Sequence, residues 1–129
     1  MMQIFLSLSV LFGALFGGLP ALAQGDSKQC FHMSEMQGWK APDSKTMYIR
    51  VGVNRYFRVD LAYECPTLKS IGAFLVTKAH GSDLVCDPID WDLKVAEPPP
   101  GGMAEPCMVK AMRPMTADEV KAIPPEFKP

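Results

Sequence analysis

The chain has 129 residues, with 13 lysines and arginines against 14 aspartates and glutamates and a formal net charge of −1. This length supports one domain with one modest core. A charge so close to zero creates no overall field that would favour nucleic acid or an anionic membrane surface, so neither is an expected partner.

Residues 1–23 are predicted to be a secretory signal peptide. Ile4–Gly18 is almost entirely apolar, Pro20 interrupts it, and Ala21–Ala23 provides an A-x-A cleavage site. The alternative is an uncleaved membrane anchor, but the apolar run is shorter than the roughly 20 residues of a spanning helix. We therefore expect cleavage after the A-x-A motif, a single mature domain at 24–129 without stable membrane insertion, and a periplasmic or secreted location.

The first predicted elements of the mature chain are two strands joined by a tight turn. Thr46–Gly52 and Tyr56–Ala62 are rich in β-branched and aromatic residues, and the VNR between them is short enough for a hairpin. In the second strand apolar side chains alternate with charged ones, so one face should pack into the core. The apolar positions are Phe57, Val59 and Leu61. Gly72–Lys78, a more continuous apolar run, is predicted to be a buried strand.

Four aspartates surround one cysteine in the segment 80–95. Its first residues, HGSD, predict a turn, and DLVC predicts a short strand. Beyond them Ile89, Trp91 and Leu93 alternate with Asp90 and Asp92, so a strand would bury the apolar set and leave both aspartates in solvent. The spacing does not match a calcium-binding loop, because no glycine follows where that loop needs one. We expect a polar strand face here and no metal site.

The C-terminal part is predicted to be a loop, a strand and a short helix. Ala96–Pro106 is a surface loop rich in proline and glycine, and Cys107–Met112 is the last strand. Thr116 and Glu119 form a capping box that begins a helix, and two prolines end it after Ile123. The whole pattern predicts a mainly β fold: a small antiparallel barrel or sandwich of five to six strands with one short C-terminal helix.

Four cysteines follow the predicted leader, an even number that indicates two disulfides in an oxidising compartment. They are Cys30, Cys65, Cys86 and Cys107. Three pairings are possible. We favour Cys30–Cys107 with Cys65–Cys86, because the first and last cysteines open similar stretches, CFHMSEM and CMVKAM, that would suit neighbouring strands. Each bridge would contribute about 2–4 kcal/mol to stability.

No catalytic residues are predicted, and no cofactor is expected. The sequence has no G-x-S-x-G motif, and its only histidines are His32 and His80. The HGSD turn contains histidine, serine and aspartate, but catalytic triads are assembled from positions distant in sequence. We expect a protein without enzymatic activity.

Methionine, together with one histidine, suggests a candidate metal site. His32, Met33 and Met36 could supply soft ligands for copper(I), with the methionines of the CMVKAMRPM segment beside them. The simpler interpretation is that methionine fills irregular gaps in a small core.

A basic and aromatic hairpin is the second candidate for binding. Arg50, Arg55, Tyr56 and Arg58 would suit an anionic polymer such as a cell-wall glycan or nucleic acid. The alternative is a solvated strand face whose charges pair with acidic neighbours across the sheet.

Several segments resemble a family of small exported proteobacterial proteins defined as a domain of unknown function. They are CFHMSEMQGW, APDSKTMYIRVGVNRYFRVDLAYECPTL, LVCDPIDWDL and PCMVKAMRPMTADEVKAIP. The resemblance covers Gln29 to about Pro129, and the helix start differs from the usual leucine at Met115. It implies export, disulfides and a single β-rich domain, and it brings no catalytic residues.

Together these observations predict an exported, non-enzymatic binding or structural module. A copper-binding protein and an inhibitor of an exported hydrolase are the alternatives, the latter from the small size, the bridges and the PPPGG loop. An envelope protein or a glycan is the expected kind of partner.

Overall fold

A computed structural model describes residues 29–99 and 101–129, in which six strands of at least six residues carry the fold. They are β2 (Met36–Asp43), β3 (Thr46–Val51), β4 (Arg55–Leu61), β5 (Phe74–Ala79), β7 (Trp91–Ala96) and β9 (Val109–Pro114). This part of the chain also has three two-residue strands and one α-helix, besides short 3-10 helices: β1 (Phe31–His32), β6 (Leu84–Val85), β8 (Glu105–Pro106) and α1 (Ala117–Ala122). The predicted fold class, mainly β and antiparallel with a short C-terminal helix, is confirmed.

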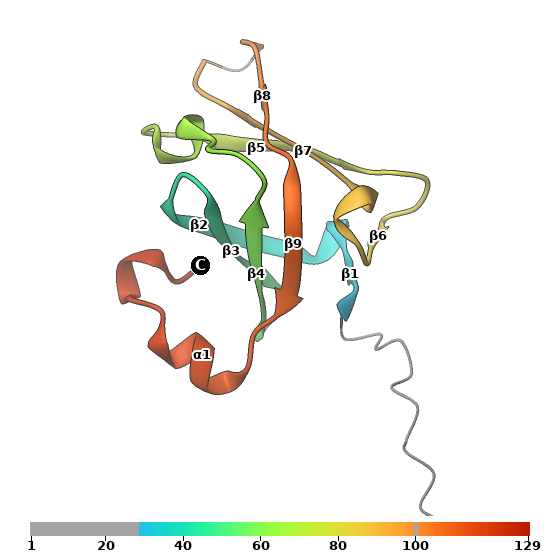
Figure 1. Cartoon of the computed structure of the whole chain (residues 1–129), viewed down its shortest axis with the longest axis vertical. Coiled ribbons are helices and arrows are strands. Elements are labelled where there is room, and N and C mark those ends of the chain that lie inside the picture. The colour runs from blue at the N-terminus through green and yellow to red at the C-terminus, as the bar shows by residue number, and fades with distance from the viewer. Residues whose placement is uncertain (1–28, 100) are drawn as a thin grey trace, which may run out of the picture.

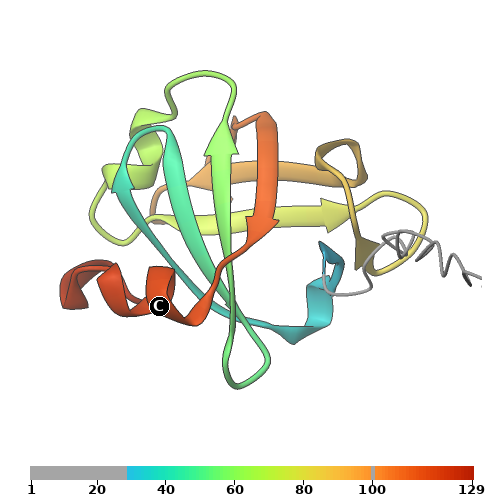
Figure 2. The same ribbon diagram turned by 60° about the horizontal axis from the view of Figure 1, so that its bottom comes forward.

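The strands form three antiparallel sheets. The largest has the order β2-β3-β4-β9, the second has the order β5-β7-β8, and β1 pairs with β6. In Figures 1 and 2 the strands β5 and β7 run across and behind the four-stranded sheet at a steep angle. The two larger sheets therefore pack in an orthogonal arrangement, with the apolar core between them.

The β3–β4 hairpin shows why the alternating sequence forms this sheet. Ile49 lies opposite Phe57, and both are fully buried, while the residues on either side of each point away from the core. Gly52 begins the turn with a φ of 61°, a left-handed conformation that a side chain would strain. Period-two alternation thus gives β4 one apolar face and one polar face, as its sequence predicts.

Aromatic rings join the two larger sheets. Phe31 lies 5.2 Å from Phe57 and 5.7 Å from Trp91 between ring centroids, the second pair in an edge-to-face arrangement. The indole Nε1 of Trp91 donates a hydrogen bond to Thr77 Oγ1. The Thr77 hydroxyl in turn donates to the Met33 sulfur, which lies 3.8 Å away. The buried indole therefore has the partner that its N–H needs.

Five of the six residues predicted to form the core are buried, and Ile89 is not. Trp91, Leu93, Phe57, Val59 and Leu61 are all buried. Ile89 is 83% exposed, so the prediction that it faces the core was wrong. Residues Pro88–Asp90 form a 3-10 turn rather than the start of the strand, and period-two alternation applies only from Trp91 onward.

Asp90 has a structural role that strand periodicity did not predict. Its Oδ2 accepts hydrogen bonds from the backbone N–H groups of Cys86, at 3.1 Å, and Asp87, at 3.0 Å. Asp92, in contrast, lies in β7 with its carboxylate 3.8 Å from the Lys94 ammonium, and both side chains are partly exposed. Asp92 matches the predicted solvated position, whereas Asp90 closes a turn.

Replacing Asp90 with alanine should lower the free energy of unfolding by about 0.5–2 kcal/mol, the usual cost of losing a side chain that caps backbone N–H groups. The matched change Asp92→Ala should cost less than about 0.5 kcal/mol, because a surface ion pair contributes little. Urea unfolding followed by circular dichroism measures both. Equal losses in the two variants would contradict the capping role.

The predicted disulfide pairing was wrong. Cys30 is bonded to Cys86 and Cys65 to Cys107. The register explains the difference: β1 pairs with β6, Phe31 opposite Val85, which places Cys30 beside Cys86. β9 pairs with β4 instead of the N-terminal stretch, Leu61 opposite Val109, and this brings Cys107 to Cys65.

The helix α1 is fastened to the four-stranded sheet by its first turn. Thr116 Oγ1 accepts a hydrogen bond from Glu119 N at 3.2 Å, which is the predicted capping box. The Glu119 carboxylate also forms an ion pair with the guanidinium of Arg113 on β9, with 2.7 Å between Oε2 and Nη2. Ile123 at the end of the helix is buried. Phe127, which follows the helix, has the Lys69 Nζ 5.1 Å from the centroid of its ring.

This attachment should weaken in acid. The hydrogen bond from Arg113, with smaller contributions from Thr116, lowers the pKa of Glu119 from 4.5 to about 2. Because the folded pKa is depressed, the stability gained is present above pH 4.5 and is lost as the pH falls from there towards 2. The melting temperature of wild type should exceed that of Glu119→Gln at neutral pH, and the difference should disappear across this window.

Glutamine keeps the capping box, so the comparison isolates the charge. Glu126→Gln is the matched control, since Glu126 is exposed and has no ion pair among the described residues. A difference between wild type and Glu119→Gln that stays constant with pH would contradict the ion pair.

Among residues 29–99 and 101–129, no helix is long and apolar enough to cross a membrane. The predicted signal peptide lies outside the described residues.

Candidate functional site

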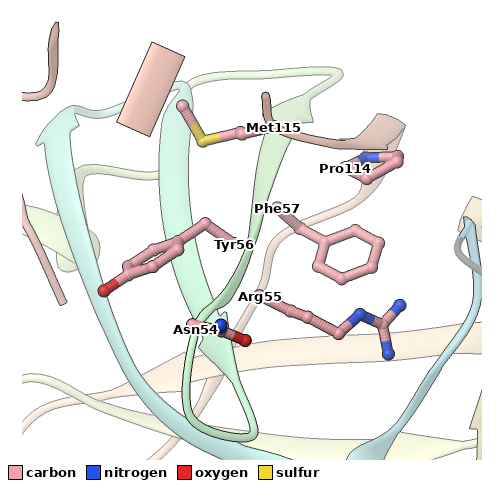
Figure 3. A pocket seen from close by; sticks show the side chains of 6 residues that line it. All are labelled: Asn54, Arg55, Tyr56, Phe57, Pro114 and Met115. Carbon is pink, nitrogen blue, oxygen red and sulfur yellow. The ribbon is translucent and has the colours of Figure 1, made fainter. Parts of the chain in front are cut away.

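A pocket of about 280 Å³ opens where β4 begins and β9 ends. Figure 3 shows the side chains around it, which come from two segments brought together by the β4–β9 pairing. They are Asn54, Arg55, Tyr56, Phe57, Pro114 and Met115. The backbone N–H of Met115 donates to Tyr56 O at 2.8 Å and holds the two segments together. This volume is slightly below the range of about 300–1,000 Å³ that is typical of small-molecule sites.

The chemistry of this pocket is apolar with a cationic side. Tyr56, Pro114 and Met115 are partly exposed and supply apolar surface, and the Arg55 guanidinium lies 5.3 Å from the centroid of the fully buried Phe57 ring. Arg55 also donates from Nη2 to the backbone carbonyl of Cys30 at 2.9 Å, which fixes its position. Such a pocket suits a small ligand with an apolar body and a hydrogen-bond acceptor or negative charge.

The face of the four-stranded sheet that points away from the core carries most of the predicted basic hairpin. Lys40, Tyr48, Arg58 and Arg113 lie in one row across the four strands. In the neighbouring row Arg50 lies opposite Tyr56. We call these six residues the cationic face. Arg55 is not among them, since it lies over Phe57, so the structure separates it from the other residues of the predicted hairpin site.

The charges of the cationic face are only partly neutralised. Arg58 Nε lies 3.1 Å from Asp60, and Arg113 lies 2.7 Å from Glu119. Arg50 Nε is buried without a hydrogen-bond partner among the described residues. A small cavity of about 200 Å³ separates Tyr48 and Arg58 from the helix α1.

The predicted HGSD turn places its aspartate against a different histidine and serine. Asp83 Oδ2 accepts a hydrogen bond from Ser34 Oγ at 2.6 Å and lies 3.6 Å from His32 Nδ1. The Ser34 hydrogen bond is the main cause of the lowered pKa of Asp83. In this order the serine proton points to the carboxylate and not to an imidazole, so the geometry does not activate Ser34 as a nucleophile.

The proposed copper ligands have other contacts. Met33 and Met36 pack against the core, and the Met33 sulfur accepts the Thr77 hydroxyl. His32 is exposed beside Asp83. The gap-filling interpretation therefore accounts for both methionines.

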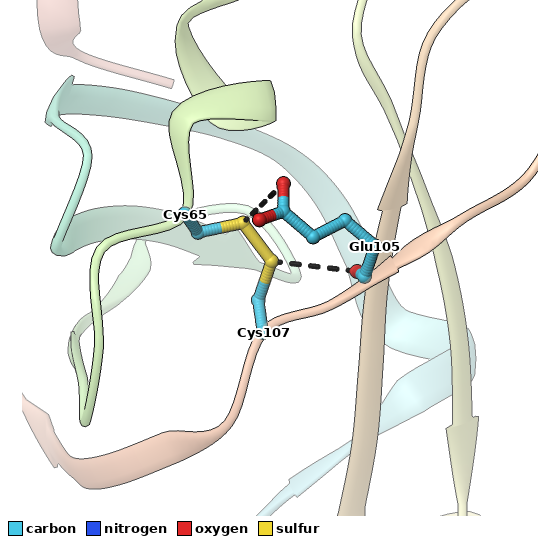
Figure 4. Close-up of side chains that lie close together, drawn as sticks. All are labelled: Cys65, Glu105 and Cys107. Atoms are coloured by element: carbon cyan, nitrogen blue, oxygen red, sulfur yellow. Dashed lines mark hydrogen bonds between the residues drawn. A yellow bond between two sulfur atoms is a disulfide. The ribbon is translucent and has the colours of Figure 1, made fainter.

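A third cluster joins Glu105 to a disulfide (Figure 4). Its carboxylate lies 3.8 Å from Cys65 Sγ, and the potential ligand atoms of Cys65, Glu105 and Cys107 are all within 4.8 Å of one another. The two sulfurs are bonded to each other and offer no thiolate, while Glu105 accepts hydrogen bonds from the Thr67 hydroxyl and backbone N–H. In this oxidised form the cluster is a structural brace rather than a metal site.

A family model, described as a family of unknown function (DUF6491), matches residues 3–126. The chain belongs to this family. The match extends over all the described strands and the helix α1 of this DUF6491 chain, and it also includes most of the predicted signal peptide. No curated protein and no solved structure shows a significant match to it.

Sequence reasoning missed part of the pocket and part of the cationic face of the DUF6491 chain. Pro114, Met115, Lys40 and Arg113 are distant in sequence from the hairpin and reach it only through strand pairing. The alternation in β4 was the signal for Arg58 and Tyr56. For the other residues no local pattern marks the site.

Proposed function

We propose that this protein is an exported, non-enzymatic binding module, and that the pocket beside Tyr56 and Met115 is its ligand site. The observation that carries the proposal is the pocket itself, in which apolar surface meets a positioned guanidinium. The ligand we expect is a small molecule with an apolar body and one acceptor or anionic group.

Export is supported by the apolar leader with its A-x-A end and by the cysteines, which are all paired in disulfides. Disulfides persist mainly in oxidising compartments such as the periplasm. A binding role without catalysis is supported by the Ser34–Asp83–His32 geometry, which lacks the order that nucleophilic catalysis needs.

The export proposal is tested by expressing the full chain in a Gram-negative bacterium and sequencing the N-terminus of the product. We expect the protein in the periplasmic fraction, beginning at Gln24 and without free thiols. Ala23→Arg should block cleavage, because the position before the cut needs a small residue. A full-length product with reduced cysteines in the cytoplasm would contradict export.

The binding proposal is tested by screening small aromatic and aliphatic acids against the isotope-labelled mature protein by NMR. Shift changes should concentrate at Asn54–Phe57 and Met115. Tyr56→Ala should weaken binding, whereas Tyr63→Ala should not, since Tyr63 is 72% exposed and is not among the residues that line this pocket. Hits that shift residues scattered over the surface would contradict the site.

A second candidate function, an inhibitor of an exported hydrolase, is favoured by the loop between β7 and β8. This loop projects from one end of the molecule in Figure 1 and carries Met103, which is 98% exposed. Ser70 Oγ donates to Glu97 at 2.6 Å and anchors the loop near its start. Inhibition of a panel of exported hydrolases that is abolished by Met103→Asp would support this function over the first.

A further inference from the structure

The two disulfides differ in how far solvent reaches them. Cys65 and Cys107 are only 1% and 3% exposed, whereas Cys30 and Cys86 are both partly exposed. Thiol–disulfide exchange requires an external thiolate to reach one of the two sulfurs, so a buried bridge reacts only after local unfolding. Exposed bridges are the ones that exchange readily. The Cys30–Cys86 bridge is therefore the candidate for exchange with an external thiol.

The two segments that this bridge joins are also held together without it. Phe31 lies opposite Val85, and both side chains are buried in the core. The backbone N–H of Met33 donates to the carbonyl of Asp83 at 2.8 Å, and Ser34 Oγ donates to the Asp83 carboxylate at 2.6 Å. Opening the bridge should therefore leave a folded protein with the two cysteines still close together, so that the bond can form again.

Opposite charges lie beside the two bridged cysteines. The guanidinium Nη2 of Arg55 donates to the backbone carbonyl of Cys30 at 2.9 Å. The backbone N–H of Cys86 donates to the Asp90 carboxylate at 3.1 Å, and Asp87 follows Cys86 in the chain. A nearby cation favours a thiolate, and nearby carboxylates disfavour one. When the S–S bond breaks, the negative charge should therefore stay on Cys30.

We propose that Cys30–Cys86 is an exchangeable disulfide, whereas Cys65–Cys107 is structural. An external thiolate attacks Cys86 Sγ and forms a new S–S bond there, while the Cys30–Cys86 bond breaks and its electron pair leaves on Cys30 Sγ. One S–S bond replaces another, so this step involves no net oxidation. Attack of the Cys30 thiolate on Cys86 Sγ then expels the external thiolate and restores the bridge. The inference goes beyond the pocket ligand and concerns a different part of the molecule.

The charge beside Cys86 also determines which thiols react well. The attacking sulfur reaches Cys86 next to the carboxylates of Asp87 and Asp90, which repel an anionic reagent and attract a cationic one. The co-reactant that fits this site is therefore a thiol that carries a positive charge.

The first measurement opens the bridges of the purified mature protein with increasing dithiothreitol, followed by alkylation and peptide mass spectrometry. We expect Cys30 and Cys86 to be labelled at least about tenfold faster than Cys65 and Cys107, because the buried pair reacts only after local opening. The circular dichroism spectrum should stay native while only the first bridge is open. In urea the two bridges should open at similar rates, and this control assigns the difference to the fold.

The second measurement identifies the sulfur that is attacked. Cysteamine should form its mixed disulfide mainly on Cys86 and leave Cys30 as the free thiol. Relative to their rates in urea, cysteamine should react severalfold faster with the folded protein than the anionic thiol mercaptoethanesulfonate does. Arg55→Gln should move part of the adduct to Cys30, because the cation no longer favours the Cys30 thiolate.

Arg58→Gln is the matched control for Arg55→Gln. It removes the same charge from the same strand, but Arg58 pairs with Asp60, so the adduct should stay on Cys86. Melting temperatures show whether both variants are folded. The position of the adduct is a readout that a general loss of stability would not move.

Four results would overturn the proposal: simultaneous opening of both bridges in the folded protein, loss of the fold once Cys30–Cys86 is open, an adduct mainly on Cys30, or a faster reaction of the anionic thiol. The ligand screen of the pocket uses the oxidised protein and detects no change in covalent bonds. Failure of either proposal therefore leaves the other standing.

Discussion

Trp91→Ala should lower the free energy of unfolding by about 3–5 kcal/mol, which is the usual cost of truncating a large buried aromatic residue. Trp91 is only 5% exposed and packs edge-to-face on Phe31. It also satisfies its indole N–H through Thr77, so the substitution leaves both a cavity and a broken hydrogen-bond chain to Met33. Because small domains are stable by only about 5–15 kcal/mol, much of the stability of this protein depends on this residue.

Urea unfolding monitored by far-ultraviolet circular dichroism measures the effect. Ile89→Ala, two positions earlier, is the matched control. Ile89 is exposed, so its loss should change stability by less than about 0.5 kcal/mol. A large loss in Ile89→Ala with a small one in Trp91→Ala would contradict the burial of Trp91 and the exposure of Ile89.

Removing the buried bridge with Cys65→Ala and Cys107→Ala should cost about 2–5 kcal/mol, as for native disulfides in small secreted domains. Both cysteines are buried, and the bridge joins residues 42 positions apart. It ties the end of β4 to the start of β9, next to the Glu105–Thr67 hydrogen bonds. Loss of the bridge should therefore loosen the β4–β9 pair at the end opposite the pocket.

Calorimetry of the double variant gives the change in melting temperature, and peptide mapping under non-reducing conditions gives the pairing. We expect one peptide pair that contains Cys30 and Cys86 and another that contains Cys65 and Cys107. In the double variant, thiol labelling should stay negligible because Cys30 and Cys86 remain bonded. A map with Cys30 linked to Cys107 would contradict the β1–β6 register.

Local patterns in the sequence were sufficient where neighbours along the chain decide the structure. Phe57, Val59 and Leu61 alternate with charged residues, and a strand with that period has one apolar face wherever it is placed. Thr116 and Glu119 satisfy each other within one helical turn, so the start of α1 depends on no distant contact. The same alternation indicated the mainly β class, and the even number of cysteines indicated two disulfides.

Strand pairing, which no local pattern encodes, decided the rest. The identity of each disulfide follows from β1 pairing with β6 and β9 with β4, because a bridge needs two backbones at short range. Ile89 fitted the alternation in the sequence. Pro88 and the Asp90 hydrogen bonds form a turn there, however, so the alternation of buried and exposed residues begins only at Trp91. The pocket and the row from Lys40 to Arg113 exist because four strands meet in one register, which brings together side chains that lie as far apart in the chain as β2 and β9.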